Sequence, residues 1–147
     1  MFEDVTHSIN ICSSFFAGSI RWMAPELILA LVEDDSGQPP PISTHSDVYA
    51  FASVCFEVAP TLCASSVTHP IPMQVATGEL PYPHRTNDRA VTVDILRGVE
   101  PSRGGWCYLL LENEDAFWTT LERCWNQECV LRPPMQELVR LLEGMKL

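Results

Sequence analysis

The stretch Gly18–Glu26 reads GSIRWMAPE, and it decides how the rest of the chain is interpreted. A glycine followed by a small hydroxyl residue favours a loop, and the Trp-Met pair supplies a large apolar anchor. Pro25 suits a first helical position because its missing N–H would have no partner there. Glu26 then lies near the positive end of the helix dipole. The stretch therefore predicts a loop, anchored by its tryptophan, that leads into a helix.

Three further motifs follow in order along the chain. They are SDVYAFA at Ser46–Ala52, TGELPY at Thr77–Tyr82, and Arg123-Cys124-Trp125 followed by Leu131-Arg132-Pro133. Together the four motifs resemble the C-terminal part of the catalytic domain of protein kinases, in the form typical of the tyrosine-kinase-like group. The resemblance covers Gly18 to Leu147. It implies an all-α fold, the C-lobe (large lobe) portion of a protein kinase-like fold, from the activation segment to the last helix.

On this reading residues 1–147 form one partial protein kinase domain with four segments. Residues 1–33 hold the end of the activation segment and the helix opened by Ala-Pro-Glu, and residues 43–58 form the central helix, capped by Ser43 or Thr44. Residues 59–75 are an insertion, and residues 76–147 supply the C-terminal helices. The apolar spacing of Phe117, Leu121 and Trp125 predicts one of these helices.

The insertion interrupts the family pattern between the central helix and its exit loop. The surplus from Val58 to Gln74 begins with a codon that starts GT and ends with a codon that can be CAG, which are the two ends of a spliceosomal intron. We therefore interpret it as a retained intron. The alternative is a genuine surface-loop insertion, which costs little entropy. In either case its prolines predict irregular, exposed chain over Ala59–Gln74.

Composition limits the classes of partner. The chain has 9 Lys plus Arg against 19 Asp plus Glu, a net charge of −10, which disfavours nucleic acid and anionic membranes as partners. No apolar run has the length of a membrane span, and the first residues do not resemble a secretory signal. We expect an intracellular, most simply cytoplasmic, protein. The six cysteines include no C-x-x-C pair and are expected to be reduced and, for the most part, small core residues.

The resemblance assigns roles to residues that composition would not single out. Ala24, Pro25 and Glu26 form the family's APE motif, and Glu26 is expected to form a buried ion pair with Arg132. In the family, the residue matching Asp47 holds backbone amides of the catalytic loop. The alternative for Asp47, favoured because that loop is not present in this sequence, is an ordinary carboxylate at a helix N-terminus.

Two further groups of residues lie near the activation segment. Ser19 and Trp22 occupy the substrate-side loop of the family. Ser13 and Ser14 lie where activation-loop phosphorylation would fall, although an ordinary polar loop is the simpler interpretation.

The sequence contains no G-x-G-x-x-G, V-A-x-K, H-R-D-x-x-x-x-N or D-F-G motif. Phosphoryl transfer needs positioned Mg²⁺, a lysine on the phosphates and a residue that orients the attacking hydroxyl. We therefore assign no catalytic, cofactor-binding or metal-binding residue and expect this chain alone to be inactive. ATP and Mg²⁺ belong to the complete family domain, which would transfer the γ-phosphate to Ser/Thr or Tyr of proteins. The alternative function is a non-catalytic, kinase-like protein-interaction module.

The central helix bears on both alternatives because it is apolar on nearly all sides. In a whole kinase it is packed all round. Here Val48, Phe51 and Cys55 are expected to lack some of those partners and to expose an apolar face. That face would bind a protein partner, bind the missing N-terminal kinase segment, or cause self-association.

Overall fold

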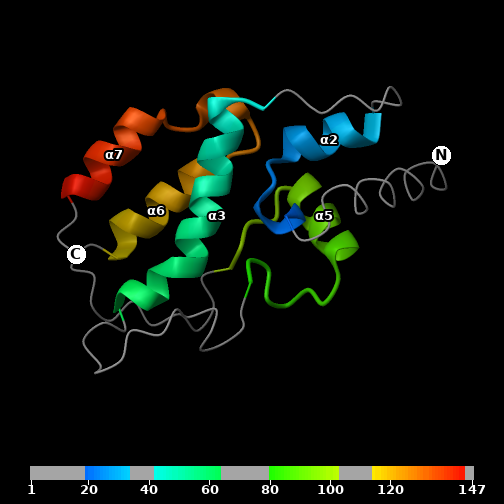
Figure 1. Cartoon of the computed structure of the whole chain (residues 1–147), viewed down its shortest axis with the longest axis horizontal. Helices are drawn as coiled ribbons and strands as arrows, with labels where there is room; N and C mark the ends of the chain where they lie inside the picture. The colour runs from blue at the N-terminus through cyan, green and yellow to red at the C-terminus, as the bar shows by residue number, and fades with distance from the viewer. Residues whose placement is uncertain (1–18, 34–41, 64–79, 103–113, 145–147) are drawn as a thin grey trace.

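The computed structural model describes residues 19–33, 42–63, 80–102 and 114–144, with the side chains of 58–63 left aside. Within these ranges the chain is helical and contains no strand, which confirms the all-α expectation (Figure 1). The elements are η1 (Ile20–Trp22), α2 (Pro25–Glu33), α3 (Thr44–Cys63), α5 (Asp88–Leu96), α6 (Glu114–Cys124), η3 (Cys129–Leu131) and α7 (Met135–Gly144). No helix in the described ranges is both long enough and apolar enough to span a membrane.

Local sequence explains where these helices begin. Before α3, Ser43 and Ser46 cap each other: each backbone N–H donates to the other's hydroxyl oxygen, at 3.2 and 3.0 Å. This resolves the choice of cap in favour of Ser43. At α5 the side-chain oxygen of Asn87 accepts the N–H of Ala90 at 2.9 Å. After the end of α5, Gly98 has a φ of 73°. This left-handed conformation ends the helix and is adopted most easily by glycine.

Helix α3 is longer than the sequence predicted. It was expected to end near Val58 and to be followed by irregular chain, yet its backbone stays helical through Cys63. The prediction is wrong for 59–63 because a single proline, Pro60, removes one hydrogen-bond donor without preventing the flanking residues from continuing a helix already nucleated. The remainder of the predicted insertion, 64–75, lies outside the described residues.

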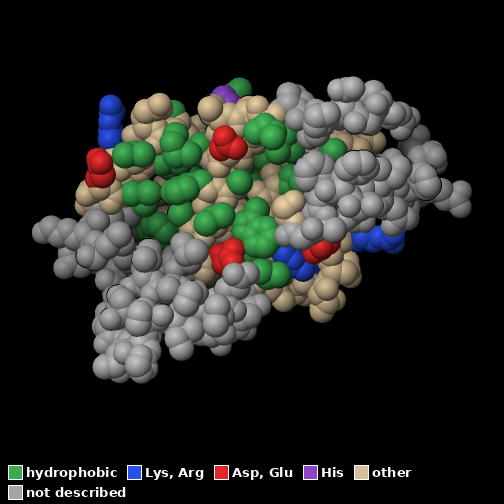
Figure 2. Space-filling view, viewed as in Figure 1, with side chains coloured by type: hydrophobic (Ala, Val, Ile, Leu, Met, Phe, Trp, Pro, Cys, Tyr) green, Lys and Arg blue, Asp and Glu red, His purple; other side chains and the backbone are tan. Residues whose placement is uncertain are grey.

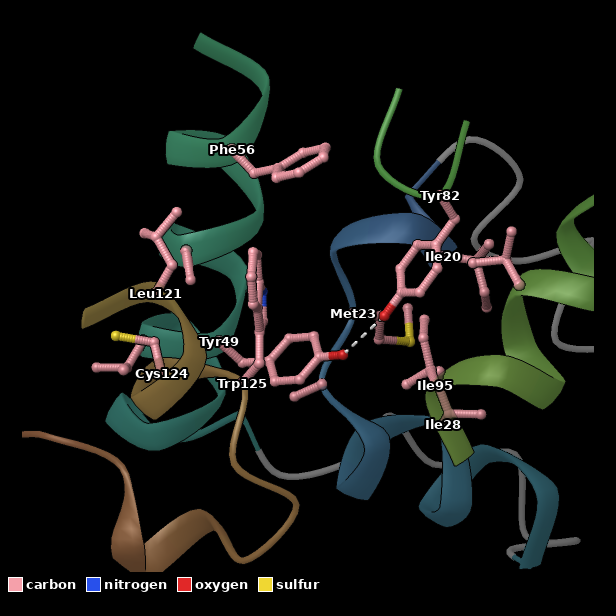
Figure 3. Close-up of a cluster of buried hydrophobic side chains, with 14 of the residues drawn as sticks. Ile20, Met23, Ile28, Tyr49, Phe56, Tyr82, Ile95, Leu121, Cys124 and Trp125 are labelled. Carbon is pink, nitrogen blue, oxygen red and sulfur yellow. Dashed lines mark hydrogen bonds between the residues drawn. The ribbon is translucent and has the colours of Figure 1, made fainter. Parts of the chain in front are cut away.

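The core lies on both sides of α3, which packs against α6 on one side and against η1 on the other. Figure 3 shows Phe56, Leu121 and Trp125 on the α3–α6 side, and Ile20, Ile28 and Ile95 on the side of η1, α2 and α5. Tyr49 of α3 reaches between the two groups. The central helix therefore joins two clusters of apolar side chains.

The expected exposure of α3 is only partly observed. Val48 is 1% exposed, so the prediction is wrong for this residue, because its face of the helix also carries the buried Tyr49 and Ala52. Phe51 and Cys55 are partly covered by the core, and Val54 is 46% exposed. A helix apolar on all sides does not reveal from sequence which side is covered, and this explains the error.

Candidate functional site

The ion pair predicted between Glu26 and Arg132 is present. The two guanidinium nitrogens Nη1 and Nη2 of Arg132 each donate to one carboxylate oxygen of Glu26, both at 2.7 Å. This two-point geometry is the strongest form of an arginine–carboxylate pair. The side chain of Arg132 is 0% exposed and that of Glu26 is 32% exposed, so burial is complete only on the arginine side.

Arg132 also fastens other segments of the chain. Its Nε donates to the carbonyl of Asn126 at 2.8 Å, and its Nη1 donates to the carbonyl of His45 at 2.9 Å. Its guanidinium carbon lies 5.1 Å from the centre of the Tyr49 ring, a cation–π contact. One buried cation thus joins the start of α2, the start of α3 and the loop before α7.

Tyr49 continues this network toward the loop before α5. Its hydroxyl lies 3.4 Å from that of Tyr82, as the dashed line in Figure 3 shows, and the Tyr82 hydroxyl donates to the carbonyl of Val99 at 3.0 Å. Burial raises the pKa of Tyr49 to about 12 and raises the pKa of Tyr82 well above its ordinary value. Both phenols therefore stay neutral and act as hydrogen-bonding links between the two clusters.

Arg21 is a second buried cation, whose role no motif of the sequence indicated, and its side chain is only 10% exposed. Its Nη1 donates to the carbonyls of Pro81 and Tyr82 at 2.8 and 3.2 Å, and its Nη2 donates to that of Arg85 at 3.0 Å. Its Nε donates to Asp88 Oδ1 at 3.2 Å. One indication of its burial is present in the sequence: Arg21 lies between two apolar residues, Ile20 and Trp22, in a motif expected to pack. A buried arginine needs hydrogen-bond acceptors, but the sequence does not show which residues provide them.

Next to this contact, Asp94 of α5 forms a second polar cluster. Arg85 donates to its two carboxylate oxygens at 2.6 and 2.8 Å, and His84 Nε2 lies 3.4 Å from Oδ2. The hydrogen bonds from Arg85 hold the pKa of Asp94 below its ordinary value, and the single contact from His84 adds to the effect.

The structure brings Ser19, Trp22 and Asp47 to one open hollow of about 250 Å³. Ser19 and Asp47 are exposed, and the half-buried Trp22 donates its indole N–H to Glu57 Oε2 of α3 at 3.0 Å. Most of the remaining wall is apolar: it consists of Met23, Ala24, Leu27, Ile42, Ser46 and Ala50. The three predicted residues are therefore neighbours, whereas Ser13 and Ser14 lie outside the described residues.

The described part of the chain holds no group of His, Cys, Asp and Glu side chains suited to a metal ion. Cys55, Cys124 and Cys129 form no disulfide. Burial raises the pKa of Cys55 and of Cys124 to about 12, which keeps both thiols protonated and unreactive. This agrees with their interpretation as packing residues.

Comparison with known proteins identifies the family to which this arrangement belongs. Residues 12–142 match the family described as protein tyrosine and serine/threonine kinase. A light-sensor protein kinase of Ceratodon purpureus is 30% identical over 135 residues, which are 88% of this chain and 9% of that protein. Serine/threonine-protein kinase STY17 of Arabidopsis thaliana is 28% identical over 128 residues, or 87% of this chain and 17% of that protein. The chain thus spans less than a fifth of the length of either relative.

Proposed function

Because this chain belongs to the protein tyrosine and serine/threonine kinase family, we propose that it forms the substrate-side helical scaffold of a protein kinase domain. The complete domain would transfer the γ-phosphate of ATP to Ser/Thr or Tyr of proteins. The observation that carries the proposal is the bidentate contact between Glu26 and Arg132, 106 positions apart. It supports a fixed arrangement of the start of α2 relative to the loop before α7.

We further propose that this chain alone does not catalyse phosphoryl transfer. Within the described ranges, no group of acidic side chains is suited to bind Mg²⁺. The motifs that place a lysine on the phosphates of ATP and carboxylates on Mg²⁺ are not in the printed sequence. Residues elsewhere in the complete domain would bind ATP and Mg²⁺. An intracellular, cytoplasmic location is part of this proposal, as is the absence of nucleic-acid and membrane partners.

The hollow beside Asp47 is the place where we propose that the catalytic part of such a domain docks. Asp47 is exposed on the first turn of α3, where its carboxylate can accept backbone N–H groups of an incoming segment. Trp22 and Leu27 offer that segment an apolar wall. The same surface supports the alternative function, a non-catalytic module that binds a protein partner.

Further apolar surface favours association of some kind. Val54, Val139 and Met135 are 46%, 47% and 36% exposed, and Figure 2 shows hydrophobic side chains gathered over α3, α6 and α7 on one face. We therefore expect the isolated chain to bind hydrophobic dyes and to self-associate or dock a partner. A strictly monomeric, dye-negative sample with a sharp melting transition would contradict this expectation.

A chimeric kinase tests the proposed scaffold function. Residues 12–142 would replace the matching segment of kinase STY17, in one form with Val58–Gln74 and in another without it. We expect at least one form to phosphorylate a generic protein substrate. Glu26→Gln should lower this activity, whereas Arg123→Gln, which removes an exposed contact to Glu137, should not. Inactivity of both well-folded forms would overturn the proposal.

The isolated chain provides the second half of the test. Titration of Mg·ATP into the purified protein in a calorimeter should give no binding heat, and a generic substrate should remain unphosphorylated. Binding of ATP at micromolar concentration would contradict the proposal that the nucleotide chemistry lies elsewhere in the domain.

A further inference from the structure

Arg21 makes four hydrogen bonds through its buried side chain, more than surface arginines usually make. Its three donor nitrogens reach three backbone carbonyls and one carboxylate, all within 2.8–3.2 Å. The acceptors belong to residues 81–88, 60 or more positions along the chain. A planar guanidinium can satisfy several acceptors at fixed angles, whereas the ammonium of lysine is a single point of charge. The contact therefore specifies orientation as well as attraction.

The acceptors form a backbone turn that needs such support. Tyr82 has φ 61°, in the left-handed region that a bulky side chain rarely occupies, and its neighbours do not include a glycine. The Arg85 N–H closes the turn by donating to the Tyr82 carbonyl at 3.0 Å. Arg21 binds the carbonyls on both sides of this strained position. Removing Arg21 would leave the carbonyl of Pro81 without this hydrogen bond and the carbonyl of Tyr82 with only the bond from Arg85 N–H, so the turn would be held less firmly.

The turn leads directly into helix α5, and Asp88, the first residue of that helix, also contacts Arg21. At its other end Arg21 belongs to η1, between the loop residue Ser19 and Trp22. Helix α5 and η1 also pack against each other. One side chain thus joins the loop at the hollow to a turn and a helix from a distant part of the sequence.

We propose that Arg21 is a positioning residue that makes the loop 19–22, the turn 81–85 and helix α5 move as one body. The inference rests on the proposed function at one point only, namely that the loop 19–22 lies on the substrate side of the kinase domain. A force on α5, such as a bound protein, would then reach Ser19 and Trp22 through Arg21. The coupling itself is a property of this chain and can be measured without any phosphorylation assay.

Amide hydrogen exchange of the full 147-residue chain tests the coupling. Two amides report on the proposed unit and a third is a reference outside it. Met23 donates to Ile20 O in the loop, Arg85 donates to Tyr82 O in the turn, and the reference, Trp125, donates to Leu121 O in the remote α6. We expect Arg21→Lys to accelerate exchange of Met23 and Arg85 together, by about tenfold or more, and to leave Trp125 within about twofold.

Two further variants make the result decisive. Asp88→Asn keeps all three carbonyl contacts and should accelerate the same two amides by a smaller factor, about threefold, so it decides the question if Arg21→Lys does not fold. Arg123→Gln is the control, because it removes an exposed arginine contact outside this region and should change neither amide.

The inference is overturned if only one of the two amides accelerates, or if neither does. It is also overturned if Trp125 accelerates equally, because Arg21 would then act on global stability and not on a local unit. These outcomes are separate from those of the chimeric kinase. An active chimera with uncoupled amides would retain the proposed function and reject the role of Arg21.

Discussion

The two sides of helix α3 are held together by different kinds of interaction. On the side of η1, α2 and α5, buried or partly buried charges carry much of the organisation: Arg21 binds the turn 81–85, and Arg85 binds Asp94. On the side of α6, the aromatic rings of Phe56, Trp118 and Trp125 pack against one another. Their arrangement is edge to face or tilted, with ring centroids 5.8–6.2 Å apart. A substitution on the first side leaves particular buried polar groups without a partner, whereas truncation of a ring on the second side leaves a cavity among its neighbours.

The largest expected effect comes from breaking the aromatic side. Trp125 is 1% exposed, and its indole N–H donates to Ser53 Oγ at 3.1 Å. Trp125→Ala should lower the free energy of unfolding by about 3–5 kcal/mol, because it leaves a cavity beside the rings of Phe56 and Trp118 and removes the hydrogen bond that the Ser53 hydroxyl accepts. Urea unfolding followed by circular dichroism measures this. Trp125→Phe, which fills more of the space, should cost clearly less, and equal losses would contradict the packing argument.

The next effect concerns the ion pair that connects the two sides. Glu26→Gln should lower the free energy of unfolding by about 2–3 kcal/mol, below the range for fully buried pairs because Glu26 is one-third exposed. The matched control is Glu137→Gln, which breaks an exposed Arg–Glu contact and should cost less than about 1 kcal/mol. Similar losses in the two variants would show that burial of Arg132 does not distinguish the pairs.

A smaller effect should appear as a dependence of stability on pH. The pKa of Asp94 is lower in the folded than in the unfolded chain, so its contribution is present above the ordinary pKa of aspartate and is lost as the pH falls through the folded pKa. Melting temperatures between about pH 6 and pH 2 should fall more steeply for the native chain than for Asp94→Asn. Arg85→Met should reduce the slope as well. Parallel curves for the native chain and Asp94→Asn would contradict this assignment.

The smallest effect is expected for the predicted insertion. Removal of Val58–Gln74 shortens α3 by its helical residues 58–63 and also shortens the connection that follows. We expect it to raise stability slightly, by about 1 kcal/mol or less, because a shorter connection costs less entropy to close. A lower melting temperature would show that the segment contributes packing. Sequencing a cDNA across Glu57–Ala76 tests the intron interpretation separately, and a transcript that keeps these codons would reject it.

Sequence reasoning predicted the parts of this fold that depend on short motifs. The start of α2 was predictable because Pro25 acts locally. The ion pair between Glu26 and Arg132 was predictable only through the family resemblance, since nothing local links two positions so far apart. Neither source identified Arg21, because its acceptors are backbone carbonyls that any residue could provide. The covered side of α3 also escaped prediction, since its apolar residues surround the helix.

The distance in sequence between Glu26 and Arg132 has a consequence for biosynthesis. A ribosome adds about 5–20 residues per second, so roughly 5–20 s separate the synthesis of these two residues. During that interval the carboxylate of Glu26 remains in water and α2 lacks its contact to the loop before α7. The nascent chain therefore cannot complete this junction until the ribosome has passed residue 132. A ribosome stalled before Arg132 would hold a helical chain with its two ends still unjoined.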